Sequence, residues 1–165
     1  MSEEILDLVN ERDEVIGRAS RKEVNKKGLL YRSTGIYAMI GNKVIIEKRS
    51  WKKKIRPGNL SIVEETVKSG ETYEEAAIRG VKEELGVKPK NLKFIGKRII
   101  RDTVYPDYFL VSVYTCKVPT RLKIQKEEVE KIITVTKKGL NELLKHREDV
   151  APTLIKTISM FNRNF

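Results

Sequence analysis

The chain has 165 residues, of which 39% are hydrophobic and 35% are charged, and its formal net charge is +11. This composition excludes an intrinsically disordered chain, and the length fits a single domain over residues 1–165. No stretch approaches the roughly 18 consecutive apolar residues that a membrane span needs, so we expect no membrane partner.

The charge surplus favours anionic partners, namely phosphorylated small molecules, nucleotides or RNA. A surface rich in Lys and Glu, which is typical of proteins adapted to heat, would give the same surplus without any binding patch. The lone Cys116 cannot form an internal disulfide, and the amino-terminal stretch is too poor in apolar residues for a signal peptide. We therefore expect a cytoplasmic protein.

The first part of the chain is expected to form strands around one short helix. Apolar runs of strand length predict strands at Ile5–Val9, from Val15 onward, at Thr34–Ile40, at Val44–Glu47 and at Leu60–Val67. Gly41-Asn42 joins the third and fourth of these as a hairpin. Ser20 is a suitable N-cap for a short helix that ends near Gly28.

The helix predicted from Thr72 to Leu85 has the clearest signals in the chain. Thr72 and Glu75 form a capping box, and Gly86 ends the helix. Its buried face is expected to consist of four apolar residues at helical spacing, namely Ala77, Ile78, Val81 and Leu85.

Beyond this helix, strands and helices continue to alternate. Strands are expected near Leu92–Ile100, Tyr108–Cys116 and Val129–Val135, and helices from Lys137 to about His146 and from Thr153 to about Phe161. The apolar face of the last helix would pack on its own sheet or on a partner subunit, which leaves a homodimer open. The whole order implies an α/β fold, with a mixed β-sheet between helices as an α/β/α sandwich.

Four charged residues surround the helix at 72–85: Glu71, Arg79, Glu83 and Glu84. Arg79 and Glu83 are four residues apart and can pair along one helix face. Glu83 and Glu84 are expected side by side, away from the buried face. Such carboxylates repel each other, and a hard divalent cation would relieve the repulsion. The alternative is that both simply lie on a solvated helix end.

The stretch from Glu65 to Val87 resembles the signature of the Nudix hydrolases. That signature reads G, five residues, E, seven residues, R-E-U, one residue, E-E, one residue, G-U, where U is aliphatic. This chain keeps every spacing and matches at Glu71, Arg79, Val81, Glu83, Glu84, Gly86 and Val87. It departs at Glu65, where the family has glycine, and at Gly80, where the family has glutamate. The resemblance implies the Nudix fold with a degenerate Nudix box.

Three further stretches, Asp7–Arg21, Glu47–Gly58 and Gly70–Ala77, resemble the Nudix subfamily grouped with isopentenyl diphosphate isomerase. That subfamily contains pyrophosphate-cleaving hydrolases as well as isomerases. The isomerase is disfavoured here, because Asn25 and Tyr31 stand at the places of two histidine metal ligands. The stretch after the second hairpin strand also lacks the isomerase cysteine.

The resemblance implies a role for each matching residue. Glu83 and Glu84 would hold Mg²⁺ or Mn²⁺ against a pyrophosphate, where the cation neutralises phosphate charge and helps a water to attack phosphorus. Arg79 would orient a carboxylate, and Glu71 would brace the loop before the helix.

The two departures affect the metal site itself. The glutamate that is missing at Gly80 is normally a metal ligand or an activator of water. Because glycine inside a helix costs about 0.5–1 kcal/mol relative to alanine, either a substrate or side chain needs the vacated space or the site no longer matters. Glu64 and Glu65 stand where relatives commonly have paired glycines, so they either obstruct the site or, as we hypothesise, supply replacement ligands for the one lost at Gly80. Of the two, Glu65 is the candidate metal ligand.

Candidate substrate-binding residues lie on and before a basic loop from Trp51 to Gly58. They are Arg49, Trp51, Lys54 and Arg56, with Lys52 and Lys53 beside them. The basic side chains could meet phosphates and Trp51 could stack on a base, or the loop could be merely solvated. Glu127-Glu128, before the strand at 129–135, could supply a base or ligand, or form a solvated charge run.

Two functions remain open from the sequence. The first is metal-dependent hydrolysis of a nucleoside diphosphate linked to another moiety, with weak or altered activity. The second is a catalytically silent Nudix module that binds a nucleotide or RNA.

Overall fold

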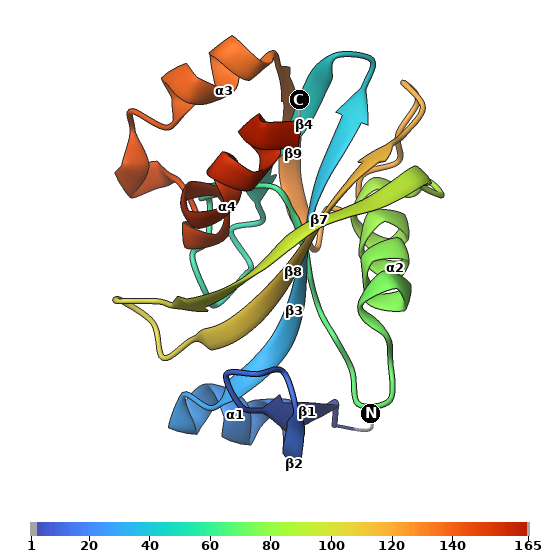
Figure 1. Ribbon diagram of the computed structural model, residues 1–165. Coiled ribbons are helices and arrows are strands. Elements are labelled where there is room, and N and C mark those ends of the chain that lie inside the picture. Colours follow the sequence, from blue (N-terminus) through green and yellow to red (C-terminus); the bar gives the residue numbers. More distant parts are fainter. Residues whose placement is uncertain (1–2, 165) are drawn as a thin grey trace.

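The computed structural model describes residues 3–164 (Figure 1). Its strands are β1 (Ile5–Val9), β2 (Val15–Ser20), β3 (Leu30–Ile40), β4 (Lys43–Arg49), β5 (Leu60–Ser61), β6 (Val63–Thr66), β7 (Lys90–Arg101), β8 (Tyr108–Lys117) and β9 (Val129–Val135). Its helices are α1 (Arg21–Lys27), α2 (Tyr73–Leu85), α3 (Lys137–Leu143) and α4 (Pro152–Asn164), with a 3₁₀ turn at Arg147–Asp149.

The strand β3 is the centre of the sheet (Figure 1). Along one edge it pairs in parallel with β8, from Leu30 opposite Tyr108 to Met39 opposite Lys117, and β7 continues the sheet beyond β8. Along its other edge β3 pairs in turn with β1, β6 and β4, each over a few residues. The nine strands of the described residues therefore form one mixed sheet.

The sheet opens between β3 and β4, which are paired only at their hairpin end in the described structure. The segment from Leu60 to Thr66 crosses this opening. Its first part, β5, pairs with β4, and its second part, β6, pairs with β3. The single strand predicted at Leu60–Val67 is therefore two short strands, because the chain changes partners at Ile62. This crossing places Glu64 and Glu65 beside β3, opposite Gly35 and Thr34.

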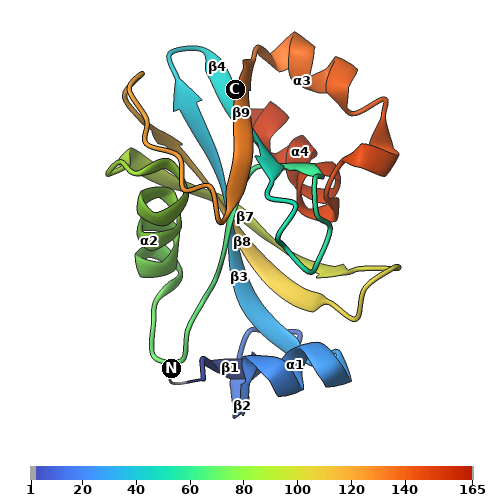
Figure 2. The same cartoon turned by 180° about the vertical axis from the view of Figure 1, so that it is seen from behind.

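Helices cover both faces of the sheet, as Figures 1 and 2 show from opposite sides. Alternate residues of β3 serve the two faces, since Ile36 packs in the cluster with α2 and Tyr37 packs in the cluster with α4. On the α4 side, Tyr37 and Phe161 stack with ring centroids 4.6 Å apart. The predicted α/β/α sandwich is confirmed, and the apolar face of α4 packs on the chain's own sheet.

The helix ends follow the predicted capping residues. The Thr72 hydroxyl accepts the N–H of Glu75 while the Glu75 carboxylate accepts the N–H of Thr72, so the capping box is confirmed. Gly86 ends α2 in the left-handed conformation with φ 69°. The predicted helix toward His146 is shorter, because α3 ends at Leu143 and a 3₁₀ turn follows.

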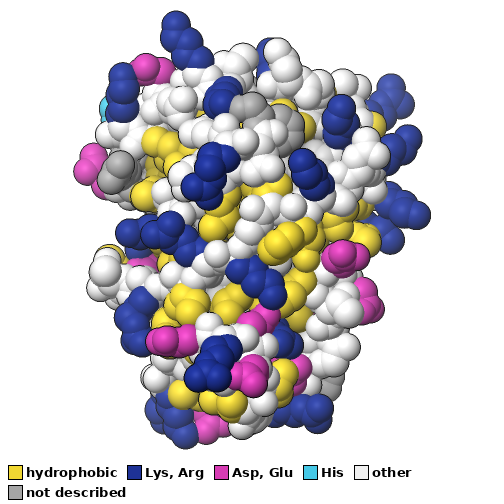
Figure 3. Space-filling model, in the orientation of Figure 1, with side chains coloured by type: hydrophobic (Ala, Val, Ile, Leu, Met, Phe, Trp, Pro, Cys, Tyr) yellow, Lys and Arg dark blue, Asp and Glu magenta, His cyan; other side chains and the backbone are white. Residues whose placement is uncertain are grey.

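The surface on the side of β7 and α4 carries many dispersed Lys and Arg side chains with hydrophobic side chains between them (Figure 3). The strand β7, which pairs with β8 alone in the described structure, exposes Lys90, Lys93 and Lys97. Charged edge strands of this kind resist pairing with a strand of another molecule. Among residues 3–164, no helix is both long and apolar enough to span a bilayer.

Cys116 is buried within β8 with 2% of its surface exposed, and this burial raises the pKa of its thiol to about 12. Because the thiolate is the reactive form, we expect the folded protein at pH 8 to react with a disulfide reagent at least about 100-fold more slowly than the unfolded chain. Mass spectrometry of protein quenched during labelling would measure both rates. Equal rates would contradict the burial of this thiol.

Candidate active site

A cavity of about 440 Å³ lies between α2 and the loop that follows β4. Eight carboxylates of the described residues line its wall, and those from β6, α2 and the loop before β9 are Glu64, Glu65, Glu83, Glu84 and Glu128. The other three are Glu4, Asp102 and Asp107. Basic side chains on its wall include those of β4, the following loop and α2, namely Arg49, Lys53, Lys54, Arg56 and Arg79, together with Arg21 and Lys68. Opposite charges in one cavity of this size suit an anionic small molecule that is bound together with a cation.

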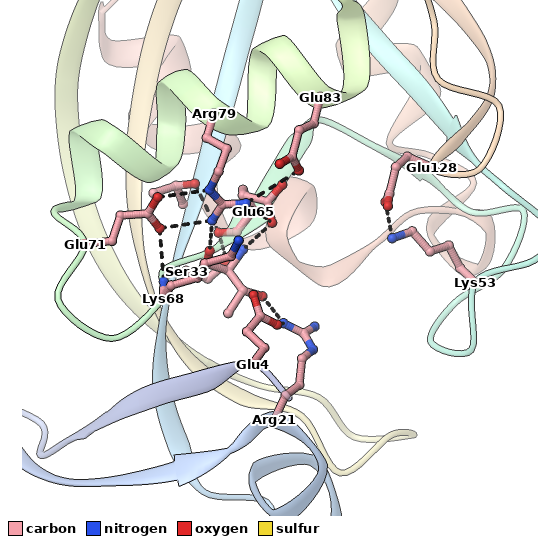
Figure 4. A network of polar contacts seen from close by, with 12 residues as sticks. Glu4, Arg21, Ser33, Lys53, Glu65, Lys68, Glu71, Arg79, Glu83 and Glu128 are labelled. Carbon is pink, nitrogen blue, oxygen red and sulfur yellow. Dashed lines mark hydrogen bonds and ion pairs between the residues drawn. The ribbon is translucent and has the colours of Figure 1, made fainter. Parts of the chain in front are cut away.

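Arg79 is the centre of a network of ion pairs on the α2 side of the cavity (Figure 4). Its guanidinium donates two hydrogen bonds to Glu71, at 2.9 and 3.0 Å, and one to the carbonyl of Thr66, at 2.7 Å. Its third nitrogen lies 3.2 Å from Glu65 and 3.5 Å from Glu83. Arg79 thus connects α2 to β6 and to the loop between them, and it holds three carboxylates in place.

Glu71 braces the loop before α2. Besides its paired hydrogen bonds with Arg79, its carboxylate accepts the backbone N–H of Lys68 at 3.0 Å. Burial alone would raise the pKa of Glu71, but the hydrogen bonds from Arg79 and Lys68 outweigh it and lower the pKa. Glu71 therefore joins Arg79 to the loop before α2 as a charged carboxylate, and it does not line the cavity.

Glu65 fills the space beside Gly80. A Cβ added to Gly80 would lie 2.8 Å from the Cβ of Glu65, which is closer than two such atoms can approach. The side chain at 65 and the absence of one at 80 are therefore sterically linked. Burial raises the pKa of Glu65 to about 7, Arg79 counteracts this effect, and Glu83 adds to it.

Glu84 lies in the interior, which corrects the prediction that Glu83 and Glu84 both face away from the buried side of the helix. Glu84 is 6% exposed, whereas Glu83 is exposed. Residue 84 follows Val81 by three positions, so it lies at the border of the buried face. There it meets the carboxyl of Glu47 on β4, which is 3% exposed.

The pair formed by Glu47 and Glu84 has unsatisfied hydrogen-bonding capacity. Oε1 of Glu47 and Oε2 of Glu84 are buried and have no hydrogen-bond partner within the described residues. Burial raises the pKa of Glu47 to about 8, and burial together with Glu47 raises the pKa of Glu84 well above its usual value. Two buried acids in contact need a shared proton or a nearby cation to remain there.

The carboxylates are not gathered around a common point in this arrangement. Within residues 3–164, no group of three or more Asp, Glu, His or Cys side chains is close enough to hold a metal ion. Glu65 and Glu83 turn toward Arg79, and Glu128 pairs with Lys53 across the cavity (Figure 4). A cation would have to draw these side chains away from their basic partners.

The basic residues predicted to bind substrate differ in whether an acidic side chain of the protein already balances their charge. Arg56 forms two hydrogen bonds of 2.7 Å with Asp102, so its charge is balanced inside the protein. Arg49 donates to the backbone carbonyl of Ile55, and Lys54 faces the cavity. Neither Arg49 nor Lys54 forms an ion pair within the described residues, which leaves both charges available to an anion.

Two sequence candidates lie apart from this cavity. Trp51 does not line it, and its side chain is 62% exposed beside a second cavity. Glu127 is on the surface, where it pairs with Lys52 at 2.8 Å, while its neighbour Glu128 lines the cavity. Within the pair Glu127-Glu128, one residue is therefore solvated and the other belongs to the site.

Sequence reasoning missed several residues of the site. Glu47 gave no signal, because an acidic residue at the end of a predicted strand is expected to face solvent. Tyr31 and Asp107 both line the cavity and share a hydrogen bond of 2.6 Å, although 76 positions separate them. The pairing of β3 with β8 brings them together, and no local pattern predicts it.

Known proteins resemble this chain in sequence. The family model described as NUDIX domain matches residues 30–156. An uncharacterized Nudix hydrolase of Streptomyces coelicolor is 32% identical over 132 residues, which cover 78% of this chain and 72% of that protein. An uncharacterized Nudix hydrolase of a Nostoc species is 30% identical over 98% of this chain and 97% of its own length.

Solved structures resemble it as well. The crystal structure of DR0079 from Deinococcus radiodurans superposes with a TM-score of 0.72 at 26% identity, covering 87% of this chain and 90% of that one. The Nudix domain of Shewanella oneidensis NrtR, determined with ADP ribose, gives a TM-score of 0.61 at 15% identity over 82% of this chain and 86% of that one. The second likeness shows a common fold.

Proposed function

Because this chain belongs to the Nudix family, we propose that it is a metal-dependent pyrophosphohydrolase acting on a derivative of a nucleoside diphosphate. The likeness of Asp7–Arg21, Glu47–Gly58 and Gly70–Ala77 supports a place in the isopentenyl-diphosphate-isomerase-like subfamily. Function within a shared fold depends on the site, so the proposal depends on what the residues around Arg79 can do.

The observation that carries the proposal is the close approach of Glu65 to Gly80. The family pattern has glycine at the first position and glutamate at the second, and this chain has the reverse. A Cβ at Gly80 would meet the Cβ of Glu65 at 2.8 Å, so the two side chains compete for one space. We infer that Glu65 supplies from β6 the carboxylate that the family supplies from the helix, and that the two departures compensate each other.

Nudix hydrolases generally use divalent metal ions, and Mg²⁺ or Mn²⁺ held by Glu65, Glu83 and Glu84 would suit this site. The buried oxygen of Glu84 that lacks a partner fits a cation, because a buried carboxylate needs a compensating charge. When bound, the cation would neutralise charge on the phosphate oxygens and make a water easier to deprotonate.

The chain's own residues would perform the remaining tasks. Arg79 and Glu71 would hold the loop and helix in register, so that the carboxylates stay at fixed positions. Arg49 and Lys54 would bind phosphate oxygens on the opposite wall of the cavity. Lys53 would exchange its partner Glu128 for a phosphate, which would release that carboxylate toward the cation.

The test is hydrolysis of a panel of nucleotide sugars, ADP-ribose and dinucleotides with Mg²⁺ and with Mn²⁺, together with Mn²⁺ binding measured by calorimetry. We expect turnover by the natural chain and a loss of at least about 100-fold in Glu84→Gln, since changes even to the partners of metal ligands cost 10- to 100-fold. Glu127→Gln is the matched control, because Glu127 is an exposed glutamate outside the cavity, and it should leave turnover unchanged.

Three results are informative. Turnover that Glu84→Gln abolishes supports the enzyme. If the protein is folded by circular dichroism and binds a nucleotide of the panel, but shows neither turnover nor metal binding, it is a catalytically silent binding module and not an enzyme. Equal turnover in Glu84→Gln and the natural chain would refute the assigned site.

A further inference from the structure

A second cavity, of about 390 Å³, shares no lining residue with the active-site cavity. Its walls come from β4, β9, the 3₁₀ turn and both ends of the loop at 50–58. The lining side chains that matter here are Lys48, Trp51, Lys131, Ile133 and Asp149. The role proposed for the active site uses none of them.

Trp51 is held as an exposed aromatic plate in this second cavity. Its ring lies against the backbone of Gly58, where an added Cβ would meet ring atoms at 2.4 to 2.9 Å. Gly58 has φ +74°, a conformation that favours glycine and permits this close approach. The loop is closed by hydrogen bonds from Gly58 N–H to Arg49 and from Arg49 N–H to Asn59. Although it is braced in this way, the Trp51 side chain is 62% exposed.

Two lysines lie directly opposite each other beside this ring. In the antiparallel pair of β4 and β9, Lys48 is the partner of Lys131. Like charges in directly opposed positions destabilise a sheet. Neither lysine has an ion pair among residues 3–164, and Nζ of Lys48 lies 4.9 Å from the centroid of the Trp51 ring. An anion between the two ammonium groups would remove their repulsion.

The surroundings favour a nucleotide over a simple anion. The next cross-strand pair, Ile46 opposite Ile133, extends an apolar surface from the lysines, and Ile133 is exposed. The carboxylate of Asp149 offers an acceptor for an N–H group of a base. These groups suit a nucleotide, because its base can stack on the Trp51 ring and contact the apolar surface while its phosphate meets the two lysines.

We propose that Trp51, Lys48 and Lys131 form a binding site for a nucleotide unit of a single-stranded nucleic acid, separate from the active site. The base stacks on the exposed part of the Trp51 ring. Its phosphate lies between the two lysines, and the side chain of Lys48 moves from the ring to the phosphate. The net charge of +11 favours a polyanionic strand at this site.

The chain has one tryptophan, so its fluorescence reports on this site alone. The experiment is titration of the full chain with a short oligouridylate and, in a second arm, with uridine monophosphate. We expect the oligonucleotide to quench the emission in a saturable way. By anisotropy of a labelled strand, Trp51→Ala should bind roughly 5- to 150-fold more weakly, and Trp51→Phe should lie between it and the natural chain.

Charge variants test the phosphate contact. Lys48→Gln combined with Lys131→Gln should reduce the slope of log K against log salt by about 0.7, since the two lysines share one phosphate and each phosphate contact to a single strand contributes about 0.7. The matched control, Lys90→Gln combined with Lys93→Gln on the edge strand β7, removes the same charge elsewhere and should bind more tightly than the test variant. Glu84→Gln should bind like the natural chain, so a failed active-site proposal would leave this result unaffected.

Each alternative has its own outcome. If the mononucleotide quenches the emission as strongly as the oligonucleotide at equal concentration, the proposed single-stranded ligand is wrong and the site binds free nucleotides. If the emission changes with protein concentration and light scattering shows a rise in mass, the occupant of this site is a second copy of the chain and not a nucleic acid. Unchanged strand affinity in a folded Trp51→Ala variant would overturn the site.

Discussion

Exchanging two residues, in the variant E65G/G80E, should restore the Mn²⁺ affinity that E65G alone loses. We expect E65G to bind Mn²⁺ about 10- to 100-fold more weakly, because it removes the carboxylate that we assign to the metal site. In the double variant, the glutamate at 80 occupies the space that Glu65 fills in the natural chain. Its affinity should return to within about threefold of the natural value, as coupled neighbouring sites allow.

The steric conflict between the side chains at 65 and 80 can also be tested through stability. Alanine in place of a helical glycine normally stabilises a protein by about 0.5–1 kcal/mol. G80A should instead destabilise this chain, because its Cβ would come within 2.8 Å of Glu65, and it should stabilise the chain when combined with E65G. Denaturant unfolding of the natural chain, G80A, E65G and E65G/G80A gives the free energy of unfolding of each, and the effect of G80A should change sign between the two backgrounds. A double variant E65G/G80E that binds Mn²⁺ as weakly as E65G would disprove the compensation.

Replacing Arg79 with alanine should be the most damaging single change in the network. The Arg79 side chain is 20% exposed and neutralises Glu65, Glu71 and Glu83. Its removal leaves partly buried carboxylates without a counter-charge, which costs about 3–5 kcal/mol in comparable cases. For a chain of this size we expect the melting temperature to fall by about 10 °C. Arg79→Lys should recover part of this loss, because it keeps the charge without the paired hydrogen bonds.

A surface arginine provides the comparison. Arg18 also pairs with an aspartate, Asp7, at 3.4 Å, but its side chain is 71% exposed. Arg18→Ala should change the free energy of unfolding by less than about 1 kcal/mol. Calorimetric melting of both alanine variants would distinguish a structural network from ordinary surface charge. Equal melting temperatures for the two would show that Arg79 does not stabilise the carboxylates.

Local signals in the sequence sufficed for most elements of the fold. The capping box at Thr72 and Glu75 and the glycine at 86 fix α2, because each acts through hydrogen bonds within a few residues. The signals failed where the outcome depended on distant partners. Leu60–Thr66 has a continuous strand pattern, yet it divides between β4 and β3, because the neighbours that it meets are set by the open hairpin.

The site shows the same division between local and distant causes. The spacing of Arg79 and Glu83 correctly predicted their contact along the helix. It misplaced Glu84, because the buried partner Glu47 comes from a strand that helical periodicity does not describe. Trp51 was grouped with Arg49 and Lys54 by proximity in the sequence, but the turn at Gly58 places it in a different cavity.

The parallel pairing of β3 with β8 has a consequence for biosynthesis. The chain makes β3 and the carboxylate-bearing α2 early, but Lys117, which completes the longest partner of β3, leaves the ribosome much later. Until then, the edge of β3 that pairs with β8 and the sheet face that α4 covers remain open to other nascent chains. The charges along β7, which is made just before β8, disfavour non-native strand pairing at the end of this interval.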